Sequence, residues 1–125
     1  MREYSVPVLV ESAPETNTTD LLLEQAAKPS NPALFAVRST GDDWQNITAT
    51  EFLADVSRIA KGLIASGIGQ GDRVGIMART RYEWTLVDFA IWFAGAVSVP
   101  VYETSSPAQV AWILGDSEAV GVVVE

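Results

Sequence analysis

Four polar residues between a Val-rich segment and a helix start are the ones best placed to contact a ligand. Glu103, Thr104, Ser105 and Ser106 follow the apolar run that ends at Tyr102. In open α/β sheets, ligands bind where strands end and helices begin. Backbone N–H groups at a helix start also favour anions. The same residues suit a simpler role, in which Ser106 only caps the next helix, and the sequence leaves both interpretations open.

A run of glycines, Gly67-x-Gly69-x-Gly71, is the second candidate for a ligand loop. In a dinucleotide-binding fold the glycine loop follows a strand and opens a helix, so that the helix N-terminus meets the pyrophosphate. Here the glycines follow a predicted helix and precede a predicted strand. Their order therefore predicts a helix cap and a turn, with Asp72 as a turn residue.

Asp88 is the acidic residue within the apolar helical run Trp84–Phe93. We expect it to face solvent at a gap in the packing or to pair with Arg79 or Arg81. Acid–base catalysis by Asp88 would need a second titrating group at useful spacing, and none is nearby. The chain contains no His and no Cys, which excludes a Ser–His–Asp triad, a Cys nucleophile and thiolate metal sites. We therefore expect no catalytic and no metal-binding residue in this chain.

Composition narrows the class of protein further. The 125 residues suffice for one domain or less, and 48% of them are hydrophobic, which permits a core that includes the four Trp. The net charge of −8 argues against nucleic-acid binding, which needs clustered Lys and Arg. The N-terminus lacks a signal-peptide pattern, and the apolar stretch Phe89–Val97 is too short to span a bilayer. We expect a soluble, cytoplasmic protein.

The first half of the chain predicts a strand, a helix, a hairpin and a long helix. The predicted strands are Tyr4–Val10, Leu34–Arg38 and Trp44–Ile47, with a hairpin turn over Thr40–Asp43; the short helix is Asp20–Ala27, capped by Thr18 or Thr19. Thr48 and Glu51 form a capping box for the long helix, and Gly67 is its C-terminal cap. The residues predicted on its buried stripe are Phe52, Val56, Ile59, Ala60, Leu63 and Ile64.

The second half alternates strands and helices, which predicts a parallel sheet. The predicted strands are Arg73–Ala78, Val97–Tyr102 and Ala119–Val124; the helices are Arg81–Ala94, begun by a Thr80–Glu83 capping box, and Pro107–Gly115, begun by Ser106 and Gln109. The fold class is thus α/β: a three-layer partial domain of parallel strands and flanking helices, plus a small N-terminal hairpin. The helix Arg81–Ala94 is apolar nearly all round, so we expect it to need a partner surface.

Several short patterns together resemble one family. They are Trp44-x-x-Ile47-Thr48, Gly71-Asp72-Arg73-Val74, Arg81-x-Glu83-Trp84, Gly95-Ala96-Val97, Val99-Pro100-Val101-Tyr102 and Asp116-Ser117. From Asp20 to its end, the chain resembles adenylate-forming acyl-CoA synthetases of the luciferase-like superfamily. It is most similar to the long-chain fatty-acid branch.

The resemblance implies a fatty acid–CoA ligase that uses ATP and Mg²⁺ to form an acyl-adenylate and then transfers the acyl group to coenzyme A. The family's phosphate loop ending in Pro-Lys-Gly, its Tyr-Gly-x-Thr-Glu segment and its small C-terminal domain are absent from this sequence. Residues 1–125 would then be the first part of a truncated large N-terminal domain, inert alone and expected to bind no cofactor. By position in related synthetases, Tyr102, Glu103 and Thr104 would flank the coenzyme A channel. Peripheral membrane contact is a further expectation for the longer protein.

A second interpretation is a small α/β binding or assembly module without catalysis. Receiver-like domains place acidic residues at strand ends, whereas Arg79 and Thr80 follow the first parallel strand here. The length of the open reading frame would separate the two interpretations. For the isolated fragment, the apolar helix and the terminal strand Val120–Val124 predict association with itself, because an unpaired strand edge can pair with another chain.

Overall fold

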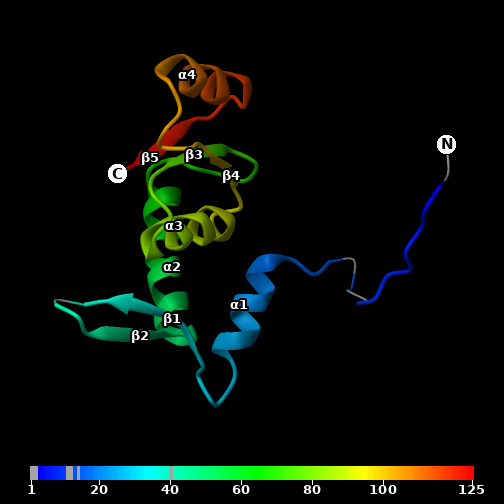
Figure 1. Ribbon diagram of the computed structural model, residues 1–125, viewed down its shortest axis with the longest axis vertical. Helices are drawn as coiled ribbons and strands as arrows, with labels where there is room; N and C mark the ends of the chain where they lie inside the picture. Colours follow the sequence, from blue (N-terminus) through cyan, green and yellow to red (C-terminus); the bar gives the residue numbers. More distant parts are fainter. Residues whose placement is uncertain (1–2, 11–12, 14, 40) are drawn as a thin grey trace.

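The computed structural model describes every residue except 1–2, 11–12, 14 and 40. It confirms the predicted α/β class, with a parallel sheet between helices and a separate antiparallel strand pair (Figure 1). The strand order in the parallel sheet is β4-β3-β5, where β3 spans Arg73–Met77, β4 spans Val97–Pro100 and β5 spans Gly121–Val124. Both neighbours run parallel to the central strand β3, as predicted.

Two helices lie on one face of this sheet (Figure 1). The helix α3 (Tyr82–Phe93) packs against β3, where Val74, Ile76 and Ile91 belong to one buried cluster. The helix α2 (Ala49–Ala65) packs along α3. Within the chain, α2 covers a second side of the apolar helix α3, and the expected need for an outside partner stays a prediction.

The opposite face of the sheet is covered by α4 (Pro107–Asp116), which comes closest at Gly75 (Figure 1). A Cβ atom on Gly75 would lie 2.8 Å from Cδ2 of Leu114 and 3.0 Å from Cγ2 of Val122. A side chain at this position would therefore have to displace the side chains of Leu114 and Val122. The absence of a side chain at Gly75 lets Leu114 of α4 pack directly on the sheet.

The two ends of α4 are held in different ways. At its start, Ser106 and Gln109 form the predicted capping box, in which the Ser106 N–H donates to Gln109 Oε1 at 2.8 Å. Just past its end, Arg73 of β3 donates from Nε to the Ser117 carbonyl at 2.8 Å and pairs through Nη2 with Glu118 at 2.6 Å. No described residue within α4 is buried, and the bonds from Arg73 tie the chain just past the C-terminal end of α4 to β3.

The long helix α2 begins and ends as the sequence predicts. The Thr48 N–H donates to Glu51 Oε2 at 2.8 Å, and the Glu51 N–H donates to Thr48 Oγ1 at 3.4 Å, which confirms the capping box. Past the last turn, Gly67 has φ +96°, a backbone conformation that favours glycine, and its N–H donates to the Ile64 carbonyl at 3.0 Å. The C-terminal glycine cap is therefore confirmed.

The buried stripe of α2 is confirmed at Phe52, Val56 and Ala60, which are at most 5% exposed. It is wrong at Ile64, which is 53% exposed. In the last turn Leu63 packs against the cluster beneath α3, and Ile64 points past it. The helical period places both residues near the buried stripe. Which of the two is buried depends on where α3 packs, and this cannot be predicted from the period alone.

The hairpin pairs β1 (Ala33–Arg38) with β2 (Trp44–Thr48) in the predicted antiparallel sense. Gly41 adopts φ +84° in its turn, which suits glycine; Thr40, predicted in the same turn, lies outside the described residues. The hairpin is joined to the helices through Phe35, whose ring lies 4.8 Å from that of Phe52.

Two predictions near the N-terminus are wrong. Tyr4–Val10 forms no strand; its side chains are exposed, and no strand lies beside it among the described residues. The first helix, α1, spans Thr18–Ala26 and begins earlier than predicted because Asn17 caps it. The Asn17 side chain accepts the N–H of Thr19 at 2.9 Å and that of Asp20 at 3.1 Å, so neither Thr18 nor Thr19 is the cap.

The start of α3 also differs from the prediction. Arg81 is its N-cap and makes no side-chain capping bond, so the Thr80–Glu83 capping box is wrong. Glu83 is instead held by the Arg81 guanidinium, with Nε–Oε2 at 2.6 Å and Nη2–Oε1 at 2.8 Å. The parallel strands are each shorter than predicted, because the chain leaves the sheet after Met77 and after Pro100 and joins it only at Gly121.

The aromatic residues are less buried than composition predicts. Trp44 is 66% exposed and Trp112 is 67% exposed, while Trp84 and Trp92 are half-buried. Among the described residues, no helix has the length and apolar character needed to cross a bilayer.

Candidate functional site

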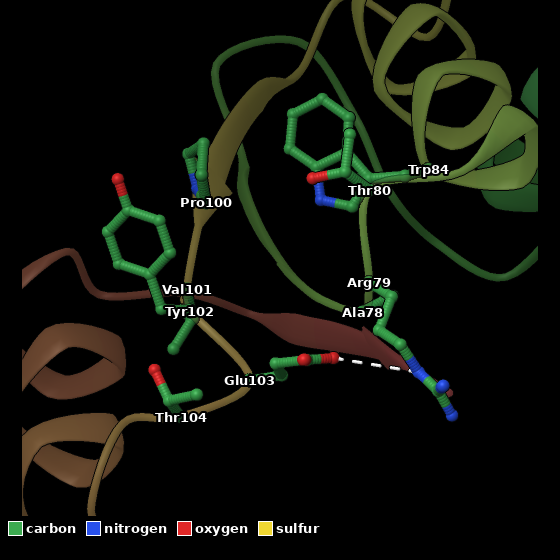
Figure 2. Close-up of a pocket in the computed structure, with 9 residues that line it drawn as sticks. All are labelled: Ala78, Arg79, Thr80, Trp84, Pro100, Val101, Tyr102, Glu103 and Thr104. Carbon is green, nitrogen blue, oxygen red and sulfur yellow. Dashed lines mark ion pairs between the residues drawn. The ribbon is translucent and has the colours of Figure 1, made fainter.

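A groove of about 580 Å³ opens at the carboxyl edge of the parallel sheet, where β3 and β4 end (Figure 2). This is the edge at which open α/β sheets bind ligands. Its lining residues, which follow β3, begin α3 or follow β4, are Ala78, Arg79, Thr80, Trp84, Pro100, Val101, Tyr102, Glu103 and Thr104.

The residues that follow β4 form one wall of the groove, because the chain stops pairing with β3 at this point. Pro100 has no N–H to donate, and it ends the edge strand β4 two residues before the predicted end at Tyr102. Val101 still donates to the Ile76 carbonyl at 2.8 Å and is buried. The chain then turns, with the Ser105 N–H donating to the Tyr102 carbonyl at 3.0 Å. The residues between stand exposed at the mouth of the groove.

The three predicted site residues all line this groove (Figure 2). The ring of Tyr102 is 84% exposed. The carboxylate of Glu103 points toward Arg79, with 3.8 Å between Glu103 Oε2 and Arg79 Nε. Thr104 lies just beyond, in the loop that leads to α4. Contact of these residues with coenzyme A stays a prediction.

The opposite wall of the groove consists of Arg79, Thr80 and Trp84, and none of them was predicted as a site residue. From the sequence, Arg79 serves as a candidate partner for Asp88 and as an argument against a receiver-like domain, and it is not assigned to a site. A signal was available, because the residues after two neighbouring parallel strands meet at one edge of the sheet. The polar pair Arg79–Thr80 follows β3 just as Tyr102 and Glu103 follow β4.

Five charged side chains form an ion-pair cluster beside the groove. Arg81 Nη1 lies 2.8 Å from Glu125 Oε1, and Arg79 Nε lies 3.8 Å from both Glu103 Oε2 and Glu125 Oε2. The pKa of Arg81 is raised by its hydrogen bonds to Glu83 and Glu125, and the Arg81 hydrogen bond lowers the pKa of Glu83. The Arg79 backbone N–H, followed by Arg81, lowers the pKa of Glu125. Three carboxylates against two guanidinium groups leave this cluster without excess positive charge for an anion.

Asp88 is buried, contrary to the prediction. It is 8% exposed, and its Oδ1 has no hydrogen-bond partner in the described part of the chain. Burial raises the pKa of Asp88, and a hydrogen bond with the Ser98 hydroxyl partly opposes this rise. The Ser98 Oγ also accepts the Trp92 indole N–H at 3.1 Å. Neither of the predicted arginine partners contacts Asp88.

The glycine run is a turn, as predicted. The Gly69 N–H donates to Asp72 Oδ2 at 2.8 Å, and the Gly71 N–H donates to the Gly95 carbonyl at 2.8 Å. These N–H groups are used inside the protein and do not form a phosphate loop.

The described residues do not fit a magnesium site. None of their His, Cys, Asp and Glu side chains form a group of three or more that could hold a metal ion. The groove offers a ligand an exposed aromatic ring, the Thr80 and Thr104 hydroxyls and an apolar floor that includes Pro100 and Val101.

Comparison with known proteins identifies the family to which the chain belongs. Residues 22–125 match the family described as AMP-binding enzyme, and the chain belongs to that family. The resemblance to adenylate-forming acyl-CoA synthetases is thereby confirmed.

Particular relatives agree with this class. The long-chain-fatty-acid–CoA ligase FadD15 of Mycobacterium tuberculosis is 41% identical over 125 residues, which is all of this chain and 21% of FadD15. The uncharacterized protein Rv1549 of the same species is 30% identical over 111 residues, 89% of this chain and 63% of that protein. A solved structure described as a long-chain-fatty-acid CoA ligase, from Rhodopseudomonas palustris, superposes with a TM-score of 0.74 at 29% identity, covering 85% of this chain and 26% of that one. The chain thus spans about a fifth of the FadD15 ligase that it matches.

Proposed function

We propose that residues 1–125 form the first part of the large N-terminal domain of an AMP-forming, long-chain fatty acid–CoA ligase. The observation that carries this proposal is the 41% identity to FadD15 over all 125 residues. In such a ligase, ATP and Mg²⁺ activate the fatty acid, and coenzyme A receives the acyl group. The matched segment contributes a framework of parallel strands and the groove at their carboxyl ends.

In this proposal the loop over Tyr102, Glu103 and Thr104 flanks the channel for coenzyme A. Its support is the position at the carboxyl edge of the sheet and the exposed Tyr102 ring, which offers a stacking surface for a flat base. The cluster around Arg79 has no excess positive charge. The ligand's phosphates therefore need cations that lie elsewhere in the longer protein.

The isolated chain is expected to form no acyl-CoA. The described residues lack a magnesium site, and the sequence lacks the family's phosphate loop and lysine. The test incubates the chain with ATP, Mg²⁺, palmitate and coenzyme A and measures AMP and pyrophosphate. Release above the enzyme-free blank, or tight ATP binding by calorimetry, would contradict this expectation.

A chimera tests the proposed role directly. This chain replaces the matched segment of FadD15, and we expect the chimera to keep ligase activity because the segment belongs to the same domain. Within the chimera, Tyr102→Ala is expected to raise the KM for coenzyme A several-fold and to leave ATP-dependent adenylate formation unchanged. Tyr4→Ala is the matched control, since Tyr4 is also highly exposed, at 89%, and lies outside the groove. Equal effects of the two substitutions would remove Tyr102 from the channel.

A second candidate is a small α/β binding or assembly module without catalysis. The observation that favours it is the match to Rv1549, because the matched segment covers 63% of that protein. An inactive but folded chimera, together with a ligand or protein bound by the isolated chain, would support this candidate over the first.

A further inference from the structure

One face of α3 connects the groove with β4. Trp84, Asp88 and Trp92 follow one another at intervals of four residues, which places them on the same face of the helix. Figure 2 shows Trp84 on the α3 side of the groove and Pro100, the last residue of β4, on the other side. Further along the face, the Trp92 indole N–H donates to Ser98 Oγ of β4 at 3.1 Å. The end of this face away from the groove is therefore bonded to the strand that forms the other side of the groove.

Asp88 lies in the middle of this face and carries a buried carboxylate. It is 8% exposed, and its Oδ1 has no hydrogen-bond partner among the described residues. The polar contact that it makes is a hydrogen bond from the Ser98 hydroxyl. A buried carboxylate with an unpaired oxygen costs stability, and an apolar residue would suit the surrounding helix better. Because native proteins keep few such groups, Asp88 calls for a role other than stability.

The Ser98 hydroxyl joins Asp88 and Trp92. Its oxygen accepts a hydrogen bond from Trp92, and its hydrogen is donated to Asp88. A hydroxyl has a single hydrogen to donate, so the acceptor at Asp88 fixes the direction in which this hydroxyl points. Asp88 and Trp92 are about one turn apart on α3, and both bonds converge on one residue of β4. The link therefore resists sliding of α3 along β4, and in a low-dielectric interior each bond strengthens the other.

We propose that Asp88 is a positioning residue for the groove, because its bond to Ser98 fixes the place of β4 relative to α3. Trp84 lies one turn before Asp88 on α3. Pro100 lies two residues after Ser98 on β4. The link therefore sits directly behind the groove and sets the separation of its two sides. Its consequence for coenzyme A rests on the proposed function, in which the groove flanks the coenzyme A channel.

Kinetics of the FadD15 chimera test the role of Asp88. Asp88→Ala removes the acceptor and is expected to raise the KM for coenzyme A several-fold, because the groove loses its fixed width. ATP–pyrophosphate exchange driven by the fatty acid should stay unchanged, since it precedes the reaction with coenzyme A. Asp88→Asn is expected to keep a KM close to that of the unsubstituted chimera, because the amide oxygen still accepts the Ser98 hydrogen. Asp88→Ala combined with Ser98→Ala should match Ser98→Ala alone, since the two residues act through one bond.

Leu86→Val is the matched control. Leu86 is as buried as Asp88, at 8% exposure, but it belongs to the cluster that contains Phe52 of α2. A truncation there loosens α3 without removing the bond to Ser98, and the KM for coenzyme A should not change. An equal rise in KM for Leu86→Val would overturn the proposal, as would a rise for Asp88→Asn equal to that for Asp88→Ala. A parallel loss of pyrophosphate exchange in Asp88→Ala would also overturn it, because such a loss indicates general loosening of the domain.

Nuclear magnetic resonance gives a second readout that needs no ligase activity. The chimera is labelled with ¹⁵N-tryptophan, and the indole signals are assigned by replacing each Trp with Phe. Asp88→Ala is expected to shift the indole N–H signals of Trp84 and Trp92. The signals of Trp44 and Trp112, which are exposed and lie outside α3, should not move. A chimera without ligase activity would contradict the proposed function, while these shifts still decide the role of Asp88. An unmoved Trp84 signal in Asp88→Ala would overturn the positioning role.

Discussion

Replacing Phe52 by alanine is expected to lower the free energy of unfolding by about 3–5 kcal/mol, through lost burial and the cavity left behind. Phe52 is 1% exposed in the cluster that joins α1, α2, α3 and the hairpin. Its ring lies 4.8 Å from that of Phe35, 5.3 Å from Phe89 and 6.0 Å from Tyr82. The substitution therefore loosens the hairpin and the helices together.

Urea unfolding followed by circular dichroism measures this loss. Ile64→Ala is the control, because Ile64 lies on the same helix and is 53% exposed. Exposed substitutions usually change stability by about 0.5 kcal/mol or less. Similar losses for both variants would show that the cluster around Phe52 is not the main core. Small domains are marginally stable, at roughly 5–15 kcal/mol, so the Phe52 variant should be partly unfolded even without urea at raised temperature.

Replacing Asp88 by asparagine is expected to stabilise the chain at neutral pH, because asparagine fills the same buried position without a charge that burial disfavours. Burial raises the pKa of Asp88 in the folded chain above its unfolded value of about 3.9. The folded state therefore binds this proton more tightly. Its stabilising contribution is complete below the unfolded pKa and is lost as the pH rises through the folded pKa.

The stability difference between Asp88→Asn and the wild type should thus grow as the pH rises from about 4 toward neutrality. Glu51, Glu83 and Glu125 have lowered pKa values and act in the opposite direction, since their contribution is lost as the pH falls. They are present in both proteins and cancel in the difference. Asp116→Asn, at an exposed position, is the control and should show no such trend. A difference independent of pH would mean that Asp88 is not ionised at a cost.

Local patterns predicted the elements whose signals lie within a few residues. The start of α2 was correct because Thr48 and Glu51 satisfy each other's backbone, and α4 begins at Ser106 for the same reason. The same motif failed at Thr80 and Glu83, since Arg81 binds the Glu83 carboxylate. The spacing of Thr and Glu predicts a capping box. It does not reveal that a neighbouring guanidinium binds the Glu carboxylate instead.

Only one wall of the groove could be predicted from the sequence. Tyr102 and Glu103 follow a strand directly, so their place at the sheet edge is readable from sequence. Arg79 and Trp84 join them only because β3 and β4 are adjacent and parallel, which is a property of the tertiary structure. The burial of Asp88 likewise depends on how α3 packs against its neighbouring elements, β4 among them.

The helix α4 is bonded to the sheet through Arg73 just past its C-terminal end, whereas among the described residues its N-terminal end is held only by its own capping box. A helix of 10 residues is about 15 Å long, and its anchor, Arg73, grips the chain just past its final turn, at the end of the sheet away from the groove. When a helix rotates about one end, its other end moves furthest. In α4 that other end is Ser106, which is preceded by the loop that starts at Tyr102. A rotation of α4 about its C-terminal end would therefore displace the loop that leads from Tyr102 to Ser106 more than it displaces the end held by Arg73.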